Sequence, residues 1–177
     1  MINQEQKKYL SKAKIFSERL SPSNMEINSS LNSLIEIPIK LCVCPKILIV
    51  DDEISNRRVL CNYCNRVNIK SEEAINGLEA LEKVEKFNIN FQCCSNYKLI
   101  LMDSNMPLMN GEESSLKIRK YIENQMIQFP YIVCVTANAI NYKDKLLDPS
   151  LKIYDDVFYK PLRFDSFQNI LKQYKLL

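Results

Sequence analysis

The sequence predicts an α/β domain in which helices cover both faces of a parallel sheet. Four short apolar runs rich in β-branched residues are continuous rather than alternating, which is typical of strands buried on both faces. Stretches with helical periodicity separate these runs, and an order of strand, helix, strand, helix favours parallel strands with right-handed crossovers. The apolar runs are residues 46–50, 97–102, 131–135 and the weaker run 152–158.

The helices are predicted from apolar residues that recur every three or four positions. A further short strand is expected near residues 68–75, before a turn at Asn76-Gly77. The helical segments and their apolar residues are 54–66 (Leu60, Cys64 and the following Val67), 78–87 (Leu78, Leu81, Val84, Phe87), 112–124 (Leu116, Ile118, Ile122) and 163–175 (Phe164, Phe167, Ile170, Leu171, Tyr174).

The first forty residues differ in composition from the rest of the chain. Residues 3–20 are mostly polar and suit a short helix, and residues 21–33 have the Ser- and Asn-rich composition of a linker. We therefore expect an N-terminal extension at 1–40, partly helical or disordered, followed by one folded domain at 46–177.

Composition excludes several classes of function. Hydrophobic residues make up 46% of the 177 residues, as in ordinary globular domains, and no apolar stretch reaches the roughly 18 residues that a membrane span requires. The net charge of +3 is too balanced to indicate nucleic-acid binding. Histidine is absent from the sequence, which excludes His-based catalysis.

The seven cysteines indicate reduced thiols in a cytoplasmic protein. Their number is odd, and the opening residues MINQEQKKYL lack the apolar core of a secretory signal. Cys61-x-x-Cys64 would suit zinc or redox chemistry, but the sequence has no second CxxC and no histidine to complete a site. We favour small packing side chains for this pair.

Three acidic side chains follow directly after predicted strands. Asp51 and Asp52 come after the run 46–50, and Asp103 comes after the run 97–102. Ligands of open parallel sheets bind at the carboxyl ends of the strands, where three carboxylates would repel one another without a cation. Mg²⁺ prefers such oxygen ligands. A single acid here would more simply solvate a strand end, but three acids at two strand ends predict a Mg²⁺ site.

Two further strand ends supply a hydroxyl and an ammonium group. Thr136 follows the run 131–135, and Lys160 follows the last predicted strand. Acids, metal, hydroxyl and lysine together suit phosphoryl transfer, in which charge neutralisation does most of the work. The sequence contains no P-loop motif, and its two glycines, Gly77 and Gly111, cannot form a GxGxxG fingerprint.

These segments resemble a response-regulator receiver domain. The resemblance covers about residues 46–175 and rests on V-D-D-E at 50–53, D-S-N-M-P-L-M-N-G at 103–111, V-T-A at 135–137 and Lys160-Pro161. Asn56 and the N-G-x-E-A-L segment at 76–81 are most similar to receivers of hybrid sensor histidine kinases. The resemblance implies a flavodoxin-like, doubly wound, five-stranded parallel sheet of order 2-1-3-4-5.

The resemblance also implies a role for each site residue. Asp103 would accept a phosphoryl group from a phosphohistidine on a histidine kinase or histidine phosphotransfer protein. Mg²⁺ would be held by Asp51, Asp52, Asp103 and the backbone carbonyl of Asn105, while Thr136 and Lys160 would bind the phosphoryl oxygens. The chain would thus catalyse its own phosphorylation without being a kinase itself, and whether it also hydrolyses the acyl phosphate stays open.

The sequence departs from this family pattern at two places. Many receivers carry an aromatic residue three positions before the lysine, where this chain has Val157, so the resemblance does not extend to the usual threonine–aromatic coupling. An insertion at Asn88–Asn96 precedes the third strand and is expected to form a surface loop.

Two other functions fit parts of the pattern. A receiver-like fold could serve as an unphosphorylated interaction subunit, with the N-terminal extension as its docking arm, although a scaffold has no need for clustered buried charge. A magnesium-dependent phosphatase is disfavoured, because its second catalytic acid would fall at Asn105. No output domain is expected after the last helix, so either output passes through a partner or this chain is the receiver end of a larger or split hybrid kinase. A coupling helix at 4–20 is the functional alternative for the extension.

Deletion of residues 1–33 is expected to leave a folded domain that is still phosphorylated on Asp103. The Ser-, Asn- and Lys-rich extension has too little apolar surface to offset a backbone ordering entropy of roughly 1–2 kcal/mol per residue. Thermal melting followed by circular dichroism, with the full chain as control, measures this. A molten or insoluble truncated chain would show that the extension belongs to the fold.

Overall fold

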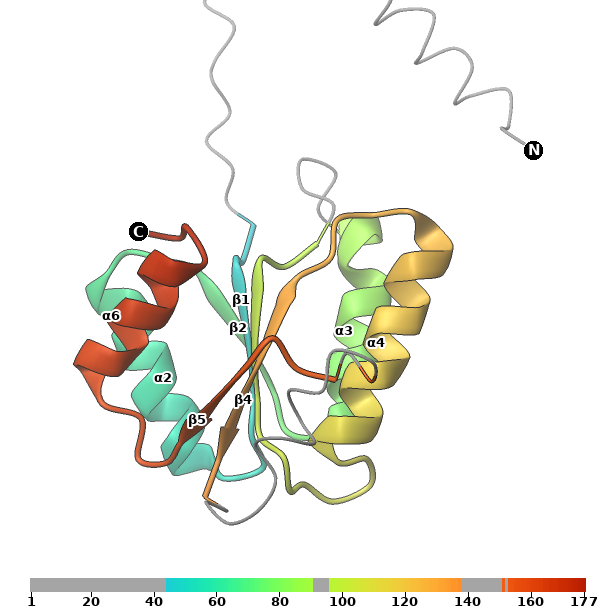
Figure 1. The fold of residues 1–177 in the computed structure, drawn as a ribbon. Coiled ribbons are helices and arrows are strands. Elements are labelled where there is room, and N and C mark those ends of the chain that lie inside the picture. The colour runs from blue at the N-terminus through green and yellow to red at the C-terminus, as the bar shows by residue number, and fades with distance from the viewer. Residues whose placement is uncertain (1–43, 91–95, 138–150, 152) are drawn as a thin grey trace, which may run out of the picture. The chain divides into compact units, whose positions relative to one another are not determined.

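A computed structural model describes residues 44–90, 96–137, 151 and 153–177 of the chain (Figure 1). Within this part the strands form one parallel five-stranded sheet with the order β2-β1-β3-β4-β5. This confirms the predicted sheet and its strand order. The strands are β1 (Ile47–Val50), β2 (Ser71–Ala74), β3 (Leu99–Met102), β4 (Tyr131–Thr136) and β5 (Asp156–Tyr159).

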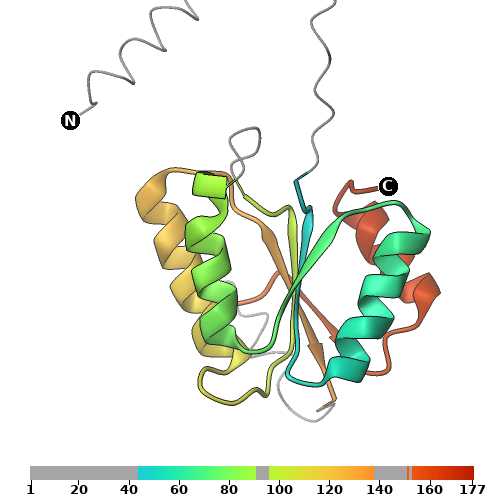
Figure 2. The ribbon, with the colours of Figure 1, turned by 180° about the vertical axis from the view of Figure 1, so that it is seen from behind.

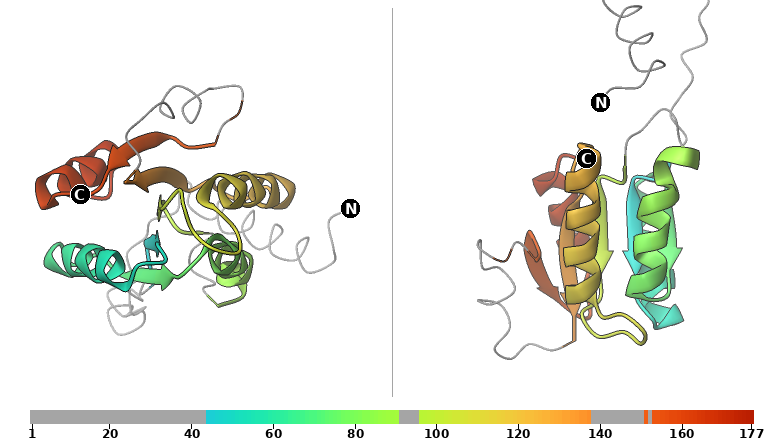
Figure 3. Two further views of the ribbon diagram at one scale, coloured as in Figure 1. Left: turned by 90° about the horizontal axis from the view of Figure 1, so that it is seen from below. Right: turned by 90° about the vertical axis from the view of Figure 1, so that its right-hand side faces the viewer.

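Helices cover both faces of the sheet, as the alternating sequence pattern predicts. Helices α2 and α6 lie on one face, and α3 and α4 lie side by side on the other (Figures 1 and 2). The left view of Figure 3 shows the same three layers from below, and the right view looks onto the face that α3 and α4 cover. The helices are α2 (Ile54–Arg66), α3 (Gly77–Asn90), α4 (Gly111–Gln125) and α6 (Phe164–Gln173).

The core lies in two layers, one on each face of the sheet. Every residue of the central strands β1 and β3 is buried, which is why their sequences are continuously apolar. One layer packs under α3 and α4 and includes Leu48, Ile100, Val84, Phe87, Ile118 and Ile122. The other packs under α2 and α6 and includes Ile49, Leu101, Leu60, Cys64, Phe167 and Ile170.

Two apolar residues assigned to buried helix faces are exposed. Leu78 on α3 is 42% exposed and Leu116 on α4 is 43% exposed. The buried positions between these two helices hold small residues instead, and Ser114 Oγ donates a hydrogen bond of 2.9 Å to the Gly77 carbonyl. Small side chains let two helices approach closely, so the larger leucines remain at the rim.

Two predicted boundaries differ from the structure. Strand β5 begins at Asp156, and the buried residues Ile153 and Tyr154 precede it. Helix α3 continues to Asn90, so the insertion at Asn88–Asn96 begins as helix rather than as a surface loop. Its residues 91–95, like the extension at 1–40, lie outside the described residues.

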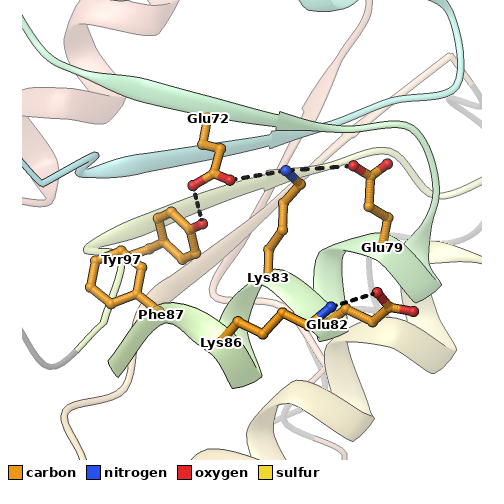
Figure 4. A pocket seen from close by; sticks show the side chains of 7 residues that line it. All are labelled: Glu72, Glu79, Glu82, Lys83, Lys86, Phe87 and Tyr97. Carbon is orange, nitrogen blue, oxygen red and sulfur yellow. Dashed lines mark hydrogen bonds and ion pairs between the residues drawn. The ribbon is translucent and has the colours of Figure 1, made fainter. Parts of the chain in front are cut away.

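A network of charged side chains ties α3 to the edge strand β2 and lines a pocket of about 260 Å³ (Figure 4). Lys83 Nζ lies 2.9 Å from Glu72 Oε1 and 3.5 Å from Glu79 Oε1. The buried Tyr97 donates its hydroxyl to Glu72 Oε2 at 2.6 Å, and its ring meets Phe87 edge-on. Because each of these charges is paired, the network serves to hold α3 against β2.

The connection from β3 to α4 is shaped by Gly111. Its backbone N–H donates to the Ser104 carbonyl at 3.0 Å, and Asn110 caps the helix by accepting from the Glu113 N–H at 2.8 Å. A Cβ atom at Gly111 would lie only 2.0 Å from the backbone oxygen of Asp103. The chain after Asp103 can therefore turn back this closely only with glycine at position 111.

Gly111→Ala is expected to destabilise the domain by about 2 kcal/mol or more, because the new methyl group meets backbone that cannot move aside easily. Urea unfolding measures the change, and Lys120→Ala, at an exposed position of the same helix, is the control with an expected change within about 0.5 kcal/mol. A Gly111→Ala variant as stable as the unchanged protein would contradict this account of the turn.

Candidate functional site

The predicted acidic residues lie together because their strands are neighbours in the sheet. Strands β1 and β3 pair in parallel with Val50 opposite Met102, so the residues that follow, Asp51 and Asp103, leave the sheet side by side. The Asp103 N–H donates to the Val50 carbonyl at 2.8 Å and fixes this alignment. The carboxylates are thus placed by strand register.

Asp51, Asp52 and Asp103 form an acidic cluster. Each offers one carboxylate oxygen, and these three oxygens all lie within 4.8 Å of one another. Asp51 is 2% exposed and Asp103 is 6% exposed, whereas Asp52 is open to solvent. Two acids are therefore held away from water, and the third faces it.

Lys160 binds both buried acids. Its Nζ lies 2.8 Å from Asp51 Oδ2 and 2.8 Å from Asp103 Oδ2. The Lys160 backbone N–H donates to the Thr136 carbonyl at 2.8 Å, so the end of β4 positions the lysine. One ammonium group is shared by two carboxylates.

This sharing affects proton binding by the two partners. Burial raises the pKa of Asp103 above its ordinary value and Asp51 adds to the rise, while Lys160 and the Asn105 backbone N–H oppose it. Burial acts to lower the pKa of Lys160, but its bonds to Asp103 and Asp51 outweigh this, and the net pKa is raised. The lysine therefore stays charged, and the negative charge of Asp103 is only partly balanced by the ammonium group that it shares with Asp51.

Asp51 is also bound by the first residues of α2. Its Oδ1 accepts from the Glu53 backbone N–H at 2.9 Å and from Asn56 Nδ2 at 3.1 Å. In the sequence, only the family resemblance points to Asn56, and the structure shows its contact with Asp51. Arg57, which the sequence pattern did not select, donates to the backbone carbonyls of Asp51 and Asp52.

Thr136 lies buried at the end of β4 beside the strand that carries Asp103. Its Oγ1 is 2.6 Å from Ser104 Oγ, a hydroxyl pair that sequence reasoning did not anticipate. Asn105 is exposed two residues after Asp103. Val157 is buried in the core, while Tyr159 is 40% exposed, so the position three residues before Lys160 holds a packed aliphatic side chain.

The Cys61 and Cys64 thiols belong to the packing of α2. Burial is the main reason that the pKa is raised to about 11 for Cys61 and to about 12 for Cys64. Such thiols are protonated near neutral pH, and both metal binding and thiol exchange require the thiolate. Their environment favours the packing role over zinc or redox chemistry.

The comparisons with known proteins identify the family and the fold. A model of the response regulator receiver domain matches residues 47–172. The chain belongs to the response regulator receiver domain family. This confirms the family that the sequence motifs indicated. Among the described residues, the helices are too short or too polar to traverse a lipid bilayer.

Known relatives contain this receiver as a small part of longer chains. The chain is 37% identical over 126 residues to the peroxide stress-activated histidine kinase mak1 of Schizosaccharomyces pombe, covering 71% of this chain and 7% of the kinase. It is 33% identical over 132 residues to hybrid signal transduction histidine kinase F of Dictyostelium discoideum, covering 73% and 11%. The match thus spans roughly a tenth or less of these relatives.

The fold is also similar to solved receiver structures. The response regulator protein TrrA of Thermotoga maritima, solved in complex with Mg²⁺ and BeF, is 28% identical with a TM-score of 0.58. The similarity covers 73% of this chain and 98% of that one. The similarity therefore extends over nearly the whole of that solved chain.

Lys160→Met is expected to destabilise the domain by about 3 kcal/mol near neutral pH, because it leaves two buried carboxylates without their cation. Without the ammonium group, the folded pKa of Asp103 rises further above its unfolded value. The folded state then binds the extra proton more tightly, so the loss should shrink as the pH is lowered from about 8 to about 5.

Urea unfolding at several pH values measures this, with Lys70→Met as a control for an exposed lysine. A Lys160→Met variant whose deficit grows as the pH falls would contradict the inferred charge imbalance.

Proposed function

We propose that this receiver domain accepts a phosphoryl group on Asp103, with Mg²⁺ bound at the acidic cluster, in a His-to-Asp phosphorelay. The observation that carries the proposal is the shared lysine: Lys160 contacts both Asp51 and Asp103 at 2.8 Å, with Asp52 within metal-ligand reach. A scaffold gains nothing from two buried acids that compete for one cation, whereas a phosphoacceptor site needs both.

The residues of the cluster fit Mg²⁺. They offer carboxylate oxygens, which a hard cation prefers, from one exposed and two buried acids. Asp51 Oδ1 already accepts two hydrogen bonds, but Oδ2 accepts from Lys160 Nζ and keeps a second lone pair for a metal ion, because each carboxylate oxygen can accept two bonds. Asp51, Asp52, Asp103 and the Asn105 carbonyl would hold the ion, which would supply charge neutralisation for the transferred group.

Asp103 would act as the nucleophile. One carboxylate oxygen forms a bond to phosphorus as the phosphorus–nitrogen bond of a partner's phosphohistidine breaks, and the electron pair of that bond remains on the imidazole. Lys160 keeps its charge, because its pKa is raised, and its ammonium can follow the negative charge onto the phosphoryl oxygens. The Thr136 hydroxyl, at the neighbouring strand end, would donate to another of these oxygens.

The partner is proposed to be a histidine kinase or a histidine phosphotransfer protein. The sequence has no histidine and therefore cannot carry the donor group itself. The two relatives described above are named as histidine kinases, and this chain matches only a small part of each. Its phosphoryl donor would then be another domain or another chain.

Incubation with acetyl phosphate and Mg²⁺ is expected to add one phosphoryl group to the unchanged protein and none to Asp103→Asn, which keeps the shape but loses the nucleophilic charge. Intact-mass spectrometry measures the gain. Asp165→Asn, in the first turn of α6, is the matched control and should be phosphorylated normally. Equal phosphorylation of Asp103→Asn would contradict the assignment, and EDTA should abolish the gain in the unchanged protein and in Asp165→Asn.

A further inference from the structure

Arg57 is a charged residue at a position of α2 where the helix packs on the sheet. The buried residues of this helix are Arg57, Leu60 and Cys64, spaced as an apolar stripe is, and Arg57 is only 8% exposed. Burying a guanidinium group costs free energy unless its donors are bound, so its partners show what it does.

The guanidinium group binds two successive carbonyls of the turn that carries the acidic cluster. Nη1 donates to the Asp51 carbonyl at 2.7 Å and to the Asp52 carbonyl at 3.0 Å. Nε donates to Glu73 Oε2 at 3.0 Å, and Glu73 lies on β2 opposite Ile49 of β1. The planar fork thus fastens the turn to the neighbouring edge strand.

We propose that Arg57 is a positioning residue for the metal-binding carboxylates of Asp51 and Asp52. This inference rests on the proposed Mg²⁺ site. A single nitrogen that holds both carbonyls fixes the backbone of the two residues, and their carboxylates project from that same backbone. Outer contacts of this kind set the geometry in which ligands meet a metal ion.

The positive charge of Arg57, considered apart from its hydrogen bonds, would weaken Mg²⁺ binding. A cation near the cluster repels Mg²⁺, although Glu73, which pairs with Arg57, offsets much of this repulsion. Removal of the guanidinium group would therefore strengthen Mg²⁺ binding if charge dominated. It would weaken binding if positioning dominated, so the sign of the change separates the two effects.

Isothermal titration calorimetry with Mg²⁺ on the full chain tests the proposal. Arg57→Met is expected to raise the Kd for Mg²⁺ about 10-fold, the lower end of the usual loss for an outer-shell contact. Arg57→Lys keeps the charge but loses the fork, and we expect its Kd to rise about threefold or more. The Arg57→Lys variant alone decides the test if Arg57→Met does not fold. Arg58→Met, exposed on the same helix, is the control and should bind within about twofold of the unchanged protein.

Rescue by metal separates positioning from a general loss of structure. At saturating Mg²⁺, phosphorylation of the Arg57 variants by acetyl phosphate should return to within about twofold of the unchanged rate. A tighter or equal Kd in both Arg57 variants, with the unchanged protein binding Mg²⁺, overturns this inference alone. An unchanged protein that binds no Mg²⁺ overturns the proposed function and this inference with it.

Discussion

Two buried carboxylates share one ammonium group at the carboxyl edge of the sheet, and the rest of the site is arranged around that imbalance. With the exposed Asp52, three carboxylates face one lysine, which leaves two negative charges, the charge that one divalent cation balances. The guanidinium of Arg57 does not alter this balance, because Glu73 pairs with it. Burial raises the pKa of Asp103 and the neighbouring Asp51 adds to the rise, while Lys160 opposes it.

The pairing of the strands in the sheet places these side chains precisely. Parallel register places Asp51 beside Asp103, and the backbone hydrogen bond from Lys160 to Thr136 ties the lysine to the neighbouring strand end. The paired strands are rigid and buried. They therefore hold four side chains from four separate segments of the chain in one place, namely Asp51, Asp103, Thr136 and Lys160. The tight turn at Gly111 then carries the chain away from the site.

Much of this architecture could be predicted from the sequence, since acids directly after apolar runs must meet at one edge of a parallel sheet. The exposed leucines could not, because periodicity does not show that α3 and α4 approach through small residues such as Ser114. Arg57 and Ser104 were missed for another reason. Arg57 binds backbone carbonyls of Asp51 and Asp52, which no side-chain pattern reveals, and its partner Glu73 lies 16 residues away. The Ser104 partner Thr136 lies 32 residues away, and a local pattern carries no signal of such a contact.

The most direct measurement of the central claim is to locate the phosphoryl group itself. Reduction of the phosphorylated protein with borohydride converts an aspartyl phosphate into homoserine, which peptide mass spectrometry can place in the sequence. The charge arrangement around Lys160 predicts homoserine at position 103 and at no other acid, in a Mg²⁺-dependent amount. Homoserine at position 51 or 52, or phosphate retained on Ser104 or Thr136, would contradict it.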